Sequence, residues 1–341
     1  MAMTPGRAWL AATILAAVLL VGAIVTATLL EPHTRGFDRF QGLAIWKIDV
    51  HQRIDPEVLG YAVNVAASQG ILGIVNLGGG HAGGGLEQHL EAAARFPGRV
   101  LVFMELDERG CCDAAWADRE VARLVTGRAQ GARGLHVPRP LVSPGGARVP
   151  LGAPELDPIW RAVEGLGIPV AYSPGSRPED RERMVELLEG QPRVAFVALD
   201  MAGLGGSPAA LGALLSRLPN LHVDTAGSIP QMARDPEATR ELLVAHSDRV
   251  LLGTDLVWLQ GPRPEQRALV IGGGPPVRTR EPLLRFFDST WRFFESRDAD
   301  IPGPVAGDAA VEGLALPREA LQRIFRDNAR MLLGFGDLEA L

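Results

Sequence analysis

The chain has 341 residues, of which 47% are hydrophobic and 22% are charged, and these proportions are ordinary for a folded protein. Its formal net charge is −6 and its basic residues form no cluster, which argues against nucleic acid as a partner because phosphate binding needs a concentrated positive surface. The length allows one large domain and leaves little for a second.

The first feature of the chain is an uncharged N-terminal stretch, Ala8–Leu30. About 20 apolar residues suffice to cross a membrane as a helix. Arg7 precedes the stretch and favours leaving residues 1–7 in the cytoplasm. We therefore predict a transmembrane signal anchor over residues 8–30, a single pass through the inner (cytoplasmic) membrane, a linker over residues 31–36, and a folded body on the extracytoplasmic side. The alternative is a cleavable signal peptide cut near Val25–Ala27, which the length disfavours because signal peptides usually have about 7–15 apolar residues.

Beyond the linker, apolar runs of strand length alternate with amphipathic windows, which is typical of a parallel α/β fold. The predicted strands are Ile45–His51, Ile71–Leu77, Val100–Asp107, Gly134–Val137, Pro169–Ser173, Val194–Asp200, Leu221–Thr225 and Val250–Asp255. The predicted helices are Pro56–Gln69, Leu86–Phe96, Trp116–Gln130, Glu155–Leu166, Pro178–Glu189, Ala209–Arg217, Pro236–His246, Leu283–Ser296 and Arg318–Leu333. This series favours a (β/α)8 TIM barrel over residues 37–335, with a tail at 336–341. The alternative, an open doubly wound sheet, lacks the G-x-G-x-x-G motif that would support it.

Two short features lie in the predicted loops. The glycine-rich residues 78–85 surround His81 and predict a flexible loop over the barrel rather than a phosphate-binding loop, because no lysine follows them. Cys111 and Cys112 are neighbours, and the strained ring that a bond between them would close predicts that they stay unpaired as small buried residues.

Polar residues gather where the predicted strands end. In barrels of this kind, the chemistry lies at the carboxyl ends of the strands. The polar residues that the sequence places there are His51, Arg53, Asp107, His136, Ser173, Asp200, Asp224, Thr225 and Asp255. A strand end needs no acid for stability, so acids at several ends favour a functional site.

Several segments resemble, in the right order, the motifs of the amidohydrolase superfamily. Residues 48–53, I-D-V-H-Q-R, are similar to the D-x-H-x-H motif of its first strand, and residues 250–255, V-L-L-G-T-D, to its last strand, which delivers an aspartate. Residues 219–224 resemble the pattern P-N-x-x-x-D, and residues 324–333 resemble the closing helix with its N-A-x-x-L-L ending. The resemblance implies the barrel fold, and the nearest branch is the amidohydrolase-related group of metal-dependent hydrolases and decarboxylases.

The resemblance also implies a divalent metal, often zinc, yet the sequence departs from the family's ligands. The first strand usually supplies two histidines, and here His51 is followed by Arg53, which stays protonated and cannot ligate a cation. Ser173 and Asp200 stand where strands five and six usually bring histidines. His136 occupies the strand-four position at which binuclear members carry a carboxylated lysine, which argues against a lysine-bridged metal pair.

One interpretation is an altered mononuclear metal site. His51, Asp200 and Asp255 would supply one nitrogen and two carboxylates, and His136 would add a second nitrogen. Such a donor set is possible for zinc or manganese. Asp255 would also be the base that orients the attacking water. The positive charge of Arg53 opposes this interpretation, because like charges repel strongly at low dielectric.

A second interpretation is a pocket without metal. Arg53 would supply the positive charge, pair with Asp200 and Asp255, and bind an anionic ligand such as a carboxylate. Lys47 and Asp49 would face the same way as His51 and Arg53, because all four alternate along one strand. This interpretation predicts a pseudoenzyme or a binding protein for a small anionic molecule.

A third interpretation keeps catalysis without metal, with His51 as general base and Asp200 or Asp255 as its partner. We favour the second interpretation over the first and place the third last, because the family's ligands are replaced at three positions together.

For the substrate side we predict contacts from Arg53, His136, Ser173 and Trp258. Trp258 either lines the pocket or packs under the loop that follows it. The expected partners are a small molecule and the membrane. The aromatic residues that recur at helical spacing over residues 286–294 are predicted to be core.

Overall fold

The structure is a computed structural model that describes residues 45–338, apart from residues 176, 264–265 and 278. Within these residues no helix combines the length and the apolar character that a membrane span requires. The predicted anchor at 8–30 and the linker at 31–36 lie outside the described residues, so both stay predictions.

The strands form a curled parallel sheet, as the sequence predicts. Its barrel strands are β1 (Lys47–Ile54), β2 (Ile71–Asn76), β3 (Val100–Glu105), β4 (Gly134–Val137), β7 (Val170–Tyr172), β8 (Phe196–Ala198), β9 (Leu221–Asp224), β10 (Val250–Leu251) and β11 (Leu256–Gln260). The eighth predicted strand is broken, so that β10 pairs with β9 while β11 pairs with β1. Two backbone hydrogen bonds of 2.9 Å, from Val50 N to Leu252 O and from Asp255 N to His51 O, join the break to β1 and close the ring.

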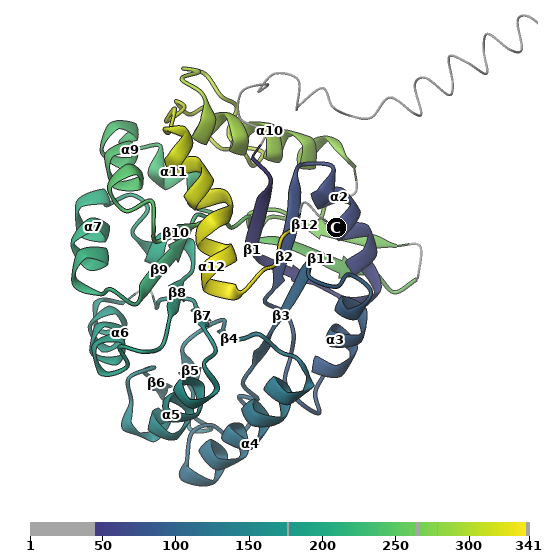
Figure 1. The fold of residues 1–341 in the computed structure, drawn as a ribbon, viewed down its shortest axis with the longest axis vertical. Coiled ribbons are helices and arrows are strands. Elements are labelled where there is room, and N and C mark those ends of the chain that lie inside the picture. Colours follow the sequence, from purple (N-terminus) through teal and green to yellow (C-terminus); the bar gives the residue numbers. More distant parts are fainter. Residues whose placement is uncertain (1–44, 176, 264–265, 278, 339–341) are drawn as a thin grey trace, which may run out of the picture. The chain divides into compact units, whose positions relative to one another are not determined.

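Helices surround this sheet, and α12 lies over one end of it (Figure 1). They are α2 (Leu59–Ala67), α3 (Leu86–Ala94), α4 (Ala114–Gln130), α5 (Asp157–Leu166), α6 (Pro178–Gly190), α7 (Pro208–Arg217), α8 (Ile229–Met232), α9 (Pro236–Ala245), α10 (Glu281–Glu295), α11 (Arg318–Gln322) and α12 (Asn328–Leu333). Local signals fix several ends: the Asp235 carboxylate accepts a hydrogen bond from Ala238 N at the start of α9, and Gly167 ends α5 in the left-handed conformation. The predicted helix 318–333 is interrupted by a π turn at Arg323–Asp327.

Two hairpins are added to the barrel. The short strands β5 (Leu141–Val142) and β6 (Arg148–Val149) pair with each other after β4. The strand β12 (Arg267–Val270) runs antiparallel to β11 and extends the sheet beyond β1.

The core fills the inside of the barrel. It includes Ile48, Val75, Phe103, Val197 and Leu251, with Ala329, Phe335 and Leu338 of the C-terminal segment. A Cβ atom at Gly73, near the start of β2, would lie 3.0 Å from a side-chain carbon of Leu338. The C-terminal segment therefore closes the amino end of the barrel. We call the opposite end, formed by the carboxyl ends of the strands, the barrel mouth.

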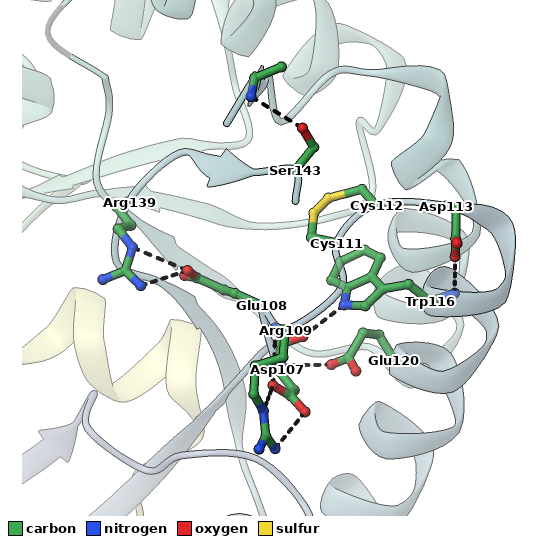
Figure 2. Close-up of a disulfide and its surroundings, with 11 residues drawn as sticks. Asp107, Glu108, Arg109, Cys111, Cys112, Asp113, Trp116, Glu120, Arg139 and Ser143 are labelled. Atoms are coloured by element: carbon green, nitrogen blue, oxygen red, sulfur yellow. Dashed lines mark hydrogen bonds and ion pairs between the residues drawn. A yellow bond between two sulfur atoms is a disulfide. The ribbon is translucent and has the colours of Figure 1, made fainter. Parts of the chain in front are cut away.

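The loop after β3 holds Cys111 and Cys112 (Figure 2). Their Cα atoms lie 3.1 Å apart in the turn that leads into α4, and Figure 2 draws a bond between the two sulfur atoms. Cys111 is buried, as the sequence predicts. Beside them, the indole Nε1 of Trp116 donates a 2.7 Å hydrogen bond to the carbonyl oxygen of Asp107.

The strand β1 corrects a prediction about which of its side chains share one face. The sequence predicts that Lys47, Asp49, His51 and Arg53 share one face. The pairing register of β1 with β2 shifts between Asp49 and Gln52, so that β1 accommodates an extra residue there. A bulge of this kind re-aims the side chains beyond it. The prediction is therefore wrong: His51 faces the mouth, whereas Lys47 lies over the ring of Trp291 on α10.

Candidate functional site

The barrel mouth holds one imidazole between carboxylates. The Nδ1 atom of His51 lies 2.9 Å from Oδ2 of Asp224, and its Nε2 atom lies 3.5 Å from Oδ1 of Asp255. Burial lowers the pKa of His51, but the carboxylate of Asp224, its hydrogen bond, and the charges of Asp255 and Asp200 outweigh burial and raise the pKa to about 9. In this arrangement the His51 ring is a cation at neutral pH.

The carboxylate of Asp224 is held from two sides. Its side chain is fully buried, and Oδ1 accepts hydrogen bonds from the backbone N–H groups of Asp200 at 2.8 Å and Ala226 at 3.2 Å. A Cβ atom at position 253 would lie 3.0 Å from Cβ of His51 and 3.1 Å from Cγ of Asp224. Gly253 therefore allows these two side chains to meet. Supporting contacts of this kind fix the orientation of a metal ligand.

Asp200 enters the site from a strained turn. Asp200, Met201 and Ala202 follow β8 with φ angles of 56°, 53° and 56°, a left-handed region that disfavours residues other than glycine. Each such residue costs roughly 1–2 kcal/mol. Asp255 also has a positive φ, of 53°. Strained backbone of this kind is concentrated at functional sites.

The three residues His51, Asp200 and Asp224 form a candidate metal centre. One ligand atom from each lies within 4.8 Å of the others. Asp200 is exposed at the rim. Partial removal of water from the Asp200 carboxyl raises its pKa to about 6. The negative charge of Asp224 adds to this shift, and the positive charge of His51 opposes it. One imidazole nitrogen with carboxylate oxygens is a donor set that fits zinc or manganese.

Arg53 stands beside this centre. Its Nη2 atom lies 3.0 Å from Oδ1 of Asp255, and its side chain is 45% exposed. Among the described residues Asp255 is its only side-chain partner, so most of its N–H donors face solvent. The guanidinium thus orients Asp255 and keeps donors free for an anion.

The β3–β4 side of the mouth holds another histidine. The Nδ1 atom of His136 lies 2.8 Å from the carbonyl oxygen of Leu77 and 3.0 Å from Oε1 of Glu105. Within the described part of the chain, the metal-ligand group does not include His136. His136, the predicted second nitrogen ligand, therefore contacts Leu77 and Glu105 instead of this group.

The two remaining predicted substrate contacts lie elsewhere. Ser173 lines a small cavity with Tyr172 and Asp180. Trp258 is buried, and its Nε1 atom donates a 3.0 Å hydrogen bond to Gln52 Oε1 while its ring packs against Tyr61. Neither contact joins them to His51, and their role in substrate binding stays a prediction.

Sequence reasoning left two acids out of the site. It named Asp224 at a strand end but chose Asp255 as the ligand, although the P-N-x-x-x-D pattern points to Asp224. It ended the third strand at Asp107, whereas Glu105 pairs with His136.

Asp107 has a different environment. Hydrogen bonds of 2.8 and 2.9 Å from Arg109, visible in Figure 2, hold the pKa of the Asp107 carboxyl well below its usual range. Arg123 adds a contact at 3.0 Å. These partners come from the loop and from α4, so the carboxylate of Asp107 is held next to that helix.

A comparison with protein families decides the ancestry of this barrel. The model of the Amidohydrolase family matches residues 84–335, which is most of the folded body. The chain belongs to the amidohydrolase family. The matched span begins after β2, so it includes Asp200, Asp224 and Asp255 of this amidohydrolase but not His51 or Arg53.

Solved structures share the fold of this amidohydrolase. An uncharacterized TIM-barrel protein from Bordetella bronchiseptica is 15% identical with a TM-score of 0.55, over 84% of this chain and 98% of that one. A protein from Pseudomonas putida, provisionally assigned as a 2-pyrone-4,6-dicarboxylic acid hydrolase, is 17% identical with a TM-score of 0.51, over 85% and 98% of the two chains. A provisionally assigned amidohydrolase from Staphylococcus aureus is 14% identical with a TM-score of 0.50, over 84% and 99%. No curated protein matches the sequence at a significant level.

Proposed function

We propose that this chain is a metal-dependent hydrolase that holds one divalent cation at His51, Asp200 and Asp224. The observation that carries the proposal is the convergence of three ligand atoms within 4.8 Å at the mouth of an amidohydrolase barrel. A bound zinc or manganese ion supplies Lewis acidity and lowers the pKa of a bound water.

The charges of the site support this proposal. Asp200, Asp224 and Asp255 can carry three negative charges, against two positive charges from His51 and Arg53. Exchange of one imidazole proton for a divalent cation balances the cluster. Metal binding that releases a proton is ordinary for a histidine ligand.

The other residues have roles that follow from their positions. Asp255 lies between His51 and Arg53, where its carboxylate can accept a proton from an attacking water. The exposed donors of Arg53 fit a carboxylate group of the substrate. The proposed substrate is therefore a small anionic molecule with a hydrolysable ester, lactone or amide bond.

Elemental analysis tests the proposal. The full chain, purified without chelators and supplied with zinc or manganese, should hold about one equivalent, because one group of ligands is present. Asp224→Asn should hold none. Asp255→Asn should keep the metal and lose hydrolysis of carboxylate-bearing esters and lactones. Asp248→Asn, at a side chain that is 64% exposed, is the control. Equal metal content in Asp224→Asn and Asp248→Asn would overturn the assignment.

A second candidate function is a metal-free anion-binding pocket. The supporting observation is that both ring nitrogens of His51 already face carboxylates, while Arg53 pairs with Asp255 at 3.0 Å. The cluster is thus largely neutralised by its own residues. Absence of metal from the native chain, together with binding of a small dicarboxylate that Arg53→Gln abolishes, would favour this function.

We also propose that residues 8–30 anchor the chain in the inner membrane with the barrel outside the cytoplasm. The support is the uncharged length of this stretch with Arg7 before it. The full chain should stay in the membrane fraction after an alkaline wash, and protease added to spheroplasts should digest the barrel. Release of the full chain by the wash, or protection of the barrel, would contradict the proposal.

A further inference from the structure

The ring of His136 has a fixed proton position. Its Nδ1 atom lies within hydrogen-bond distance of two oxygens, the Leu77 carbonyl at 2.8 Å and Glu105 Oε1 at 3.0 Å. A carbonyl oxygen only accepts, so Nδ1 must carry the proton. In the neutral ring, Nε2 then carries a lone pair and no proton.

The position of the ring follows from strand alternation. Leu101 and Phe103 of β3 point into the barrel core, so Glu105 is the next inward residue, at the mouth. His136 pairs directly with Glu105 on β4. Its ring reaches past β3 to the carbonyl of Leu77, which follows β2, and so lies across the inner face of these strands.

The side chain of His136 is 3% exposed, and its Nε2 atom is the ring nitrogen without a partner in the described part of the chain. No described residue gives it a hydrogen bond, and it is not among the side-chain atoms that are both sealed from solvent and without a partner. A histidine acts well as an acceptor or ligand when its Nδ1–H donates to a carboxylate or carbonyl and its Nε2 carries no proton.

We propose that His136, oriented by Glu105, presents Nε2 at the barrel mouth as the acceptor for a hydroxyl or other hydrogen-bond donor of the substrate. The proposal rests on the mouth being the substrate site of the proposed hydrolase. It assigns Glu105, absent from the sequence-based prediction, as the residue that positions this acceptor. This pair lies on β3 and β4, apart from the candidate metal ligands on β1, after β8 and on β9.

The chain carries an internal control for the proton position. The amide of Asn76 is fixed because its oxygen accepts from Ile54 N at 3.0 Å and its nitrogen donates to Ile54 O at 2.9 Å. The same nitrogen lies 3.2 Å from Nδ1 of His89, which must therefore accept. His89 should carry its proton on Nε2, the opposite tautomer to His136.

Two measurements on the full chain test the proposal. Long-range ¹H–¹⁵N spectra of ring-labelled histidines, assigned with His136→Gln, should show Nδ1–H for His136 and Nε2–H for His89. Diethyl pyrocarbonate should modify His136, because the Nε2 lone pair attacks its carbonyl carbon, an N–C bond forms, and the Nδ1 proton leaves with the monoethyl carbonate group. Peptide mapping by mass spectrometry should show that Glu105→Gln changes the rate of this reaction at His136, whereas His89 reacts equally slowly in both proteins.

Each outcome decides the proposal. An Nε2–H tautomer for His136, no reaction at His136, or an unchanged rate in Glu105→Gln would overturn it. Neither measurement needs a metal or a substrate. Asp224→Asn, which should empty the metal centre, should leave both His136 readouts unchanged, so failure of the metal proposal and failure of this one are distinguishable.

Discussion

The two ends of β1 shift the pKa of a buried cationic side chain in opposite directions. At the amino end, Lys47 lies 4.0 Å from Glu295 and 4.6 Å from the centre of the Trp291 ring, and burial lowers the pKa of this lysine. Burial also raises the pKa of Glu295 to about 7. At the mouth, the carboxylates around His51 outweigh burial and raise its pKa to about 9.

The surroundings of Lys47 and His51 explain why one cation is disfavoured and the other is stabilised. Around Lys47 the neighbours are one acid and aromatic rings, so desolvation dominates and the pair tends toward its neutral forms. Around His51 the nearest carboxylate, that of Asp224, is itself held by backbone N–H groups, so charge is stabilised. The first arrangement suits packing, and the second suits binding and proton transfer.

The largest expected effect comes from breaking the pair at the amino end. Lys47→Met leaves the Glu295 carboxyl buried without its cation, and we expect a loss of about 3–5 kcal/mol in the free energy of unfolding at pH 8. The double variant Lys47→Met with Glu295→Leu should recover most of it, because a packed apolar pair replaces the charges. Denaturant titration of both variants measures this. Equal losses in the single and double variants would show that the pairing does not matter.

The pH dependence of stability sharpens the same contrast. Glu295, with a side chain only 3% exposed, has its pKa raised from 4.5 to about 7, so the folded state holds a proton that the unfolded state has released. Its contribution is therefore fully present below pH 4.5 and is lost as pH rises through 7, by up to roughly 3 kcal/mol. Unfolding measured from pH 4.5 to 8 should show this fall in the native chain. Glu295→Gln should reduce the fall by this amount, because Asp200 and His51 also have raised pKa values and still contribute, and an unchanged slope would refute the assignment.

At the mouth, Gly253→Ala tests how tightly the charged residues pack. The added methyl group would meet Cβ of His51 at 3.0 Å and Cγ of Asp224 at 3.1 Å. We expect a loss of about 1–3 kcal/mol from overpacking and loss of bound metal. Gly165→Ala in α5, where nothing lies within 4 Å, should instead stabilise by about 0.5–1 kcal/mol. Equal stabilities for the two variants would mean that Gly253 has no packing role.

The sequence predicts the barrel better than the site. Apolar runs that alternate with amphipathic windows place the strands within a few residues, since each buried strand must be apolar. The prediction that Lys47 and Asp49 share a face with His51 is wrong, because the extra residue in β1 cannot be seen in the alternation of apolar and polar residues. The break after β10 also leaves no mark on the sequence, and it places Asp255 against Arg53, so the role of Asp255 as a ligand stays a prediction.

Backbone strain also differs between the two ends of the barrel. Relieving it should change the stability least of all the substitutions considered. Of the five described non-glycine residues with positive φ, four flank the mouth: Asp200, Met201, Ala202 and Asp255. Replacement of Ala202 by glycine relieves about 1 kcal/mol of strain and removes a buried methyl group of similar value, so the stability should change by less than about 0.5 kcal/mol.

The matched control is Ala66→Gly in α2, a buried alanine in an ordinary helix. It should lose about 1–2 kcal/mol, because helix propensity and methyl burial both act against it. Thermal unfolding of the two variants compares them directly. An equal loss at both positions would mean that the turn carrying Asp200 stores no strain. A smaller loss at Ala202 would locate strain in the segment that brings this carboxylate to the metal centre, since left-handed backbone is what glycine relieves.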